Sequence, residues 1–179
     1  MKTRNLTAAA LLTALAMILG LVERMLPLEM IIPLPGIKLG LANVVTLVAL
    51  YRMGVAPAAL ILGARCLLSA LFSGSMTGLA FSLTGGAMAL AAMAAARKSR
   101  RLSIYGASVL GAAAHHCGQI GVASLLMHSG AVWGYLPYLL LAGTACGLAT
   151  GSLGAGVLRR LRPADEPGAR TPAGTGEER

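Results

Sequence analysis

The stretch Pro33-Leu34-Pro35-Gly36-Ile37-Lys38-Leu39-Gly40-Leu41-Ala42-Asn43 is the longest polar interruption between the first two apolar segments of the chain. Its prolines fix φ and lack a backbone donor, its glycines permit close approach of other backbone, and Lys38 places a positive charge among apolar neighbours. Two interpretations follow. The stretch is either a tight outer hairpin whose lysine reaches the membrane surface, or a loop that lines a ligand-binding site.

The composition is that of an integral membrane protein. Of the 179 residues, 56% are hydrophobic and 12% are charged, whereas about a quarter of the residues in a soluble domain are charged. The formal net charge of +9 would suit nucleic acid, but the basic residues flank the apolar segments, where they act as topology signals. We therefore expect a multi-pass protein of the cell membrane, in contact with the lipid bilayer and not with nucleic acid.

Six apolar segments predict an all-α, polytopic membrane protein with six transmembrane helices. The expected helices cover about residues 6–22, 39–50, 55–72, 76–96, 103–127 and 133–158. The second segment is short and is expected to begin inside the loop. A cleaved signal peptide is the alternative for the first segment, but no Ala-x-Ala-like site precedes a polar region and further apolar segments follow.

Basic residues alternate between the loops as six spans require. Ten of them fall on one side and two, Arg24 and Lys38, on the other. Because Lys and Arg are enriched in cytoplasmic loops, both termini are expected in the cytoplasm. Residues 1–162 are the expected transmembrane domain, with Glu23 in its first outer loop, and residues 163–179 are the expected disordered cytoplasmic tail.

The sequence lacks the residue patterns of several catalytic sites. None of the three lysines follows a glycine as in a P-loop, so no ATPase site of that kind is expected. The only aspartate, Asp165, lies in the tail, and the scattered glutamates cannot hold Mg²⁺ for diphosphate chemistry. The three cysteines show no Cys-x-x-Cys spacing. We therefore expect no enzymatic activity, no catalytic residue, no metal site and no cofactor.

Polar side chains inside the expected spans are the candidates for function. Arg65 lies near the middle of the third span, where it must face protein, water or ligand. His115, His116 and Gln119 form the most polar patch of the fifth span. Hydrogen bonding between helices, contact with a substrate, and ligation of a metal or haem all remain open for this patch. The excess of basic groups over carboxylates suits a ligand with an anionic or carbonyl-rich group.

These motifs carry a resemblance to a known family. Pro-Gly-Ile-Lys-Leu-Gly-Leu-Ala-Asn (35–43), Arg65, Ser-Leu-Thr-Gly-Gly (82–86) and Gly-Ala-x-x-His-x-x-Gly-Gln (111–119) resemble the Gx transporter family, which is also labelled heptaprenyl diphosphate synthase component I. The resemblance covers about residues 3–158. His116 departs from it, because asparagine is expected after the histidine of the family, whereas His115 keeps the pattern.

That family is similar to the S components of energy-coupling factor transporters. These six-helix membrane proteins capture vitamins and pair with a transmembrane coupling subunit and ATPase subunits. The resemblance implies that an Ala-x-x-x-Ala face on the first helix, here Ala10 and Ala14, docks onto the coupling subunit. The substrate is then expected to be a small vitamin- or isoprenoid-like molecule, bound in the outer half of the bundle beneath the stretch that ends at Asn43.

Five residues are expected to contact that substrate. Lys38 and Arg65 would supply positive charge, and Asn43, His115 and Gln119 would supply hydrogen bonds. Two alternatives stay open. In the first, the chain is a noncatalytic membrane subunit of a heptaprenyl diphosphate synthase. In the second, it is a membrane partner in flavin- or quinone-linked electron transfer, although no haem or flavin motif supports that role directly.

Overall fold

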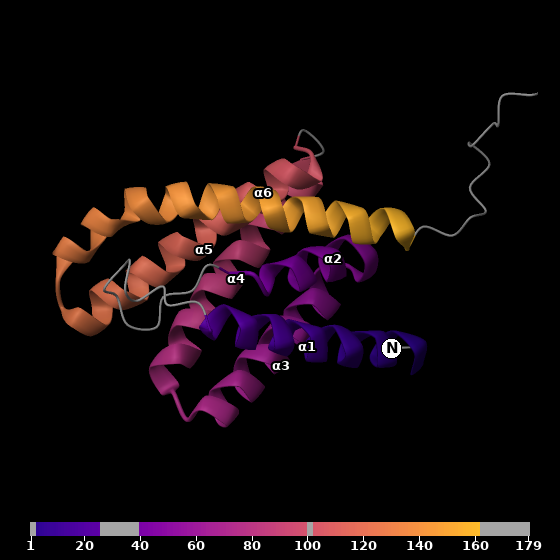
Figure 1. Cartoon of the computed structure of the whole chain (residues 1–179), viewed down its shortest axis with the longest axis horizontal. Helices are drawn as coiled ribbons and strands as arrows, with labels where there is room; N and C mark the ends of the chain where they lie inside the picture. The colour runs from indigo at the N-terminus through magenta and orange to yellow at the C-terminus, as the bar shows by residue number, and fades with distance from the viewer. Residues whose placement is uncertain (1–2, 26–39, 100–101, 162–179) are drawn as a thin grey trace, which may run out of the picture.

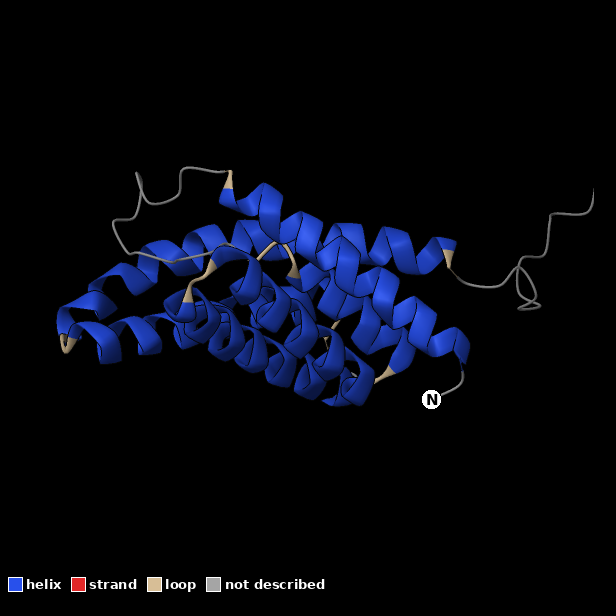
Figure 2. Ribbon diagram, turned by 90° about the horizontal axis from the view of Figure 1, so that it is seen from below, coloured by secondary structure: helices blue, strands red, loops and turns tan. Residues whose placement is uncertain are grey.

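The computed structural model describes residues 3–25, 40–99 and 102–161, and every element in these ranges is a helix (Figures 1 and 2). They are α1 (Thr3–Arg24), α2 (Asn43–Met53), α3 (Val55–Ser73), α4 (Met76–Ser99), α5 (Ile104–Met127) and α6 (Leu136–Arg160), with a short 3₁₀ helix, η2 (Gly130–Tyr135), before α6. The predicted all-α class is confirmed. Residues 163–179, the expected tail, lie outside the described residues.

The second helix differs most from its expected span. Five helices are long and apolar enough to cross a membrane, η2 and α6 counting as one. The remaining one, α2, has 11 residues, and at about 1.5 Å per residue it covers roughly half of a ~30 Å hydrocarbon core. It begins at Asn43 and not near residue 39, because Gly40 has a φ of 86° and the next two residues form a turn.

The short helix α2 is the centre of the bundle. It contacts α1, α3, α4 and α6, and all residues from Val45 to Leu50 are buried. A helix that is apolar on every side is stable only where neighbouring helices cover it. Its C-terminal end is held by Arg97 of α4, which donates a hydrogen bond to the Leu50 carbonyl and lies over the Tyr51 ring, 5.5 Å from its centroid.

Helix α5 packs between α4 and α6, and small residues make the contact with α6 close. A Cβ placed on Gly147 would lie 2.8 Å from Val109 Cα, and one placed on Gly151 would lie 3.2 Å from Tyr105 Cα. Glycine at these two positions therefore lets the backbones of α5 and α6 approach each other, as small residues do in membrane helix pairs.

The N-terminal end of α1 and the C-terminal end of α6 lie at the same end of the bundle (Figure 1). This is the arrangement that the charge pattern of the loops requires, because it puts the two ends on one side of a membrane. The assignment of that side to the cytoplasm stays a prediction.

Candidate functional site

The start of α2 lies deep inside the bundle. Gly40 adopts a φ of 86°, a conformation that favours glycine, and its carbonyl accepts a hydrogen bond from Asn43 N at 2.8 Å. A Cβ placed on Gly40 would lie 3.4 Å from His115 Nε2. Because His115 lies midway along α5, the turn before α2 reaches the middle of the bundle. Irregular backbone at that depth needs protein around it, and Gly40 is buried.

Glu23 holds this turn in place. Its side chain is only 4% exposed, and Oε1 accepts a hydrogen bond from Gly40 N at 2.5 Å. The expectation that Glu23 lies in an outer loop is therefore wrong, because the residue belongs to α1 and points into the bundle. Gly40 precedes α2, so its backbone N–H has no partner within that helix. The Glu23 carboxylate satisfies this buried donor.

His115 occupies a slot between two glycines. A Cβ placed on Gly85 of α4 would lie 2.8 Å from His115 Nδ1 and 3.0 Å from the His115 carbonyl oxygen. Gly40 borders the other side of the ring. The structure thus brings together His115 and Asn43, two of the five expected substrate-binding residues, at the junction of α2, α4 and α5.

His116 turns toward α6, where it meets a third glycine. A Cβ placed on Gly143 would lie 2.5 Å from His116 Cδ2, and the ring is 0% exposed. Both ring nitrogens are buried, and the side chain of Gln119 is the hydrogen-bonding group beside this ring in the described part of the chain. The rings of His115 and His116 meet edge to face, with centroids 5.7 Å apart and planes at 74°. Gln119, one turn further along α5, is also fully buried.

Arg65 is buried on α3, with 9% of its surface exposed. Its Nε has no hydrogen-bond partner among residues 3–25, 40–99 and 102–161. The Arg65 charge lies near the middle of α3, as expected. Lys38 and the expected lid before Gly40 lie outside the described residues.

A small cavity lies beside Asn43, among α2, α4, α5 and α6. Ser108 of α5 and Thr150 of α6 line it, and their hydroxyl oxygens are 2.7 Å apart. Cys146 and Gly147 of α6 complete the wall on that side. Ser108 and Thr150 could not be recognised as a pair from the sequence, because they lie 42 positions apart on different helices and each is a single hydroxyl residue among apolar ones.

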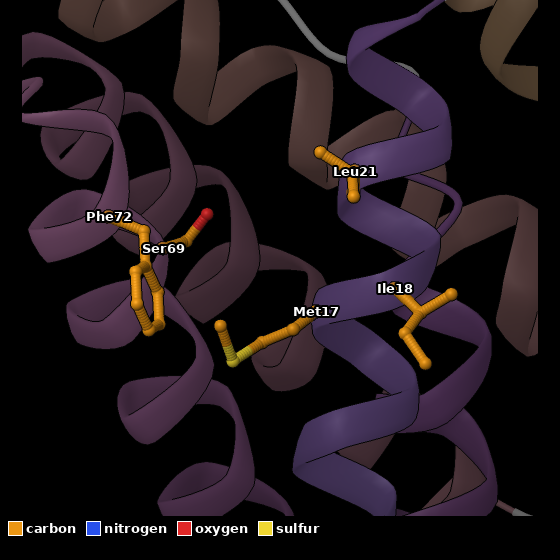
Figure 3. Close-up of a pocket in the computed structure, with 5 residues that line it drawn as sticks. All are labelled: Met17, Ile18, Leu21, Ser69 and Phe72. Atoms are coloured by element: carbon orange, nitrogen blue, oxygen red, sulfur yellow. The ribbon is translucent and has the colours of Figure 1, made fainter.

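A second, larger hollow lies on the outside of the bundle between α1 and α3 and has a volume of about 290 Å³. Figure 3 shows Met17 of α1 opposite Ser69 and Phe72 of α3. Ile18 and Leu21 complete the lining. The walls are apolar apart from the Ser69 hydroxyl, and Phe72 is largely exposed, so this groove suits hydrocarbon. It contains none of the five expected substrate-binding residues.

The two alanines expected to dock a partner lie on the outer surface of α1. Ala10 and Ala14 are exposed, whereas Ala9 and Ala16 on the same helix are buried in the core. Helix α1 therefore uses one set of alanines for packing inside the bundle and presents another to its surroundings.

The chemistry available at the centre is hydrogen bonding and charge pairing. Within the described ranges, no group of three His, Cys, Asp or Glu residues could hold a metal ion. The two histidine rings meet edge to face, with His115 against Gly85 of α4 and His116 against Gly143 of α6. The site can therefore orient a polar molecule or link helices to one another.

The comparisons with known proteins identify the family. No curated protein and no solved structure matches the chain. The model of the family described as heptaprenyl diphosphate synthase component I matches residues 12–157, which include all six α-helices in whole or in large part. The chain, a helical protein with several segments able to cross a membrane, therefore belongs to the heptaprenyl diphosphate synthase component I family.

Proposed function

We propose that this protein is the membrane-embedded substrate-binding subunit of an energy-coupling factor type transporter, similar to an S component. Its substrate is a small vitamin- or isoprenoid-like molecule, and the protein itself is not an enzyme. It works with a transmembrane coupling subunit and ATPase subunits in the cell membrane.

The observation that carries this proposal is the burial of polar side chains at the centre of an apolar bundle. Asn43, Arg65, His115 and Gln119 are each 9% exposed or less, and they come from three helices. Polar groups in a membrane bundle are costly unless they are paired, and in such proteins they mark binding sites and pathways. In the proposed role, these residues and Lys38 hold the substrate.

The exposed alanine face of α1 supports the partner half of the proposal. Ala10 and Ala14 lie four residues apart, so both face the same side of the helix. Small side chains let another helix approach closely in the membrane, where packing is the main attraction between helices. We assign this face to contact with the coupling subunit.

Filling that face with larger side chains tests the proposal. The tagged chain is co-expressed with the coupling and ATPase subunits of an energy-coupling factor transporter from the same organism, and the complex is purified in detergent. We expect the amount of coupling subunit that co-purifies with the double variant Ala10→Leu/Ala14→Leu to be at least ten-fold lower than with the unchanged chain. A ten-fold loss of affinity corresponds to about 1.4 kcal/mol of binding free energy.

Helix α4 provides a matched control. Ala91 and Ala95 are also exposed and also four residues apart. The variant Ala91→Leu/Ala95→Leu adds the same bulk to another lipid-facing surface, and it should retain the complex. If both double variants bind the coupling subunit as well as the unchanged chain does, the α1 interface is excluded.

The family description favours a second candidate function. A heptaprenyl diphosphate synthase component I would be a membrane subunit of a prenyl diphosphate synthase, and the shortage of carboxylates in the sequence would restrict it to a noncatalytic part. In the same purification, stable association with a prenyl diphosphate synthase catalytic subunit, and none with the coupling subunit, would establish this candidate in place of the first.

A further inference from the structure

The cavity beside Asn43 presents two hydrogen-bond acceptors that belong to described residues, Asn43 and Ser108. Asn43 is 9% exposed and lines the cavity, and its Oδ1 has no hydrogen-bond partner among the described residues. Its amide nitrogen lies on the side of Gly40, where an added Cβ would be 2.8 Å from Nδ2. A buried carbonyl oxygen without a donor costs about 1–3 kcal/mol, so the protein gains stability from any donor that reaches it.

The hydroxyl hydrogens of Ser108 and Thr150 are both engaged in hydrogen bonds within the protein. Thr150 Oγ1 donates to the Gly147 carbonyl at 3.1 Å. Each hydroxyl carries one hydrogen, so the 2.7 Å contact between Ser108 and Thr150 must use the hydrogen of Ser108. Ser108 Oγ is then left with lone pairs only. The cavity therefore has one unsatisfied acceptor on α2 and a further acceptor on α5, and a guest with two donors can reach both.

The size of the cavity selects the guest. Its volume is about 10 Å³, which is about the space that one water needs in a polar site. A vitamin-sized molecule does not fit. We propose that this cavity holds one ordered water, which donates to Asn43 Oδ1 and Ser108 Oγ and so links the start of α2 to α5 and α6. This water site is argued from the cavity and stands whether or not Asn43, to which the proposed function gives a substrate contact, also meets a substrate.

The direction in which Asn43→Leu changes the melting temperature tests whether the cavity holds a water. We expect Asn43→Leu, which nearly keeps the side-chain volume, to lower the melting temperature in detergent by about 2–6 °C, because the water loses its strongest acceptor. Ser108→Ala should lower it by a similar amount, and the double variant should lower it by less than the sum, since both changes break one bridge. A cavity without water gives the opposite sign for Asn43→Leu, because that change removes an unsatisfied buried oxygen.

A serine outside the cavity is the control. Ser152 of α6 is exposed and donates to the Leu148 carbonyl at 2.8 Å, so Ser152→Ala should leave the melting temperature within about 1 °C. An experimental structure of the unchanged protein that resolves waters should show one within hydrogen-bond distance of both acceptors. A melting temperature that rises with NaCl but not with choline chloride would indicate a sodium ion there and would overturn the water assignment.

Discussion

At the scale of single residues, glycine decides where the two histidine rings fit. His115 rests against Gly85 of α4, and His116 rests against Gly143 of α6. The rings are thus held on different sides of α5, which explains why adjacent polar residues in one helix contact two different neighbours. A methyl group added at Gly85 or at Gly143 would overlap the histidine ring that packs there.

We expect Gly85→Ala to destabilise the protein by about 1–3 kcal/mol, measured by unfolding in detergent. The added Cβ would lie 3.0 Å from the His115 carbonyl oxygen, which is backbone and cannot rotate away. Gly121→Ala on α5 is the matched control, because its Cβ would meet nothing within 4 Å. That change should be neutral or stabilise the helix by up to about 1 kcal/mol. Equal stability of the two variants would show that the slot is not tight.

At the scale of helices, α2 depends on contacts at both of its ends. Glu23 of α1 accepts a hydrogen bond from Gly40 N just before α2 begins, and Arg97 of α4 donates to the Leu50 carbonyl where it ends. A helix of 11 residues is marginal by itself. Its position therefore depends on its neighbours, and we expect loss of the Glu23 contact to release the turn before α2.

Two substitutions at Glu23 separate its hydrogen bond from its charge. Glu23→Gln keeps an acceptor for Gly40 N, and Glu23→Leu has a similar volume without one. We expect the Leu variant to be less stable than the Gln variant by about 1–3 kcal/mol, because a buried backbone donor is left unsatisfied. The comparison uses thermal unfolding of both proteins in one detergent. If the Leu variant is as stable as the Gln variant, the bond does not position the turn.

At the scale of the whole molecule, the bundle presents leucine-rich surfaces to lipid and buries the polar side chains at its centre, such as Asn43, His115 and Gln119. Large apolar side chains such as Leu11, Leu71 and Phe72 are exposed on α1 and α3. In water this surface would drive aggregation, whereas in a bilayer it faces hydrocarbon. The orientation of the bundle then follows from its loop charges.

Cysteine labelling tests that orientation. After Cys66, Cys117 and Cys146 are replaced by alanine, a single cysteine is introduced at Ser99, the last residue of α4, or at Ser129, between α5 and η2. A membrane-impermeant maleimide added to intact cells should label Ser129→Cys and leave Ser99→Cys unlabelled until the cells are opened. The reverse pattern would place both termini outside the cytoplasm.

The sequence by itself determined the membrane class and most of the helix ends within the described residues, whereas the second of the six expected spans is a short helix there. Hydropathy over about 20 residues is a local property, and it does not depend on which helices become neighbours. For the same reason the sequence located Asn43, Arg65, His115 and Gln119 as polar groups inside helices, and the structure buries all four. Gly143, Gly147 and Gly151 of α6 also repeat every four residues, a spacing that is readable in the sequence and typical of close packing between membrane helices.

Only the tertiary structure decided how those groups are arranged. The depth of the turn at Gly40, the bond from Gly40 N to Glu23 and the pairing of Ser108 with Thr150 all join residues that are distant in sequence. A pattern along one helix shows which positions share a face, but not which helix covers that face or how closely. The position of the short helix α2 is of this kind: Glu23 of α1 accepts from Gly40 N before its start, and Arg97 of α4 donates to the Leu50 carbonyl in its last turn.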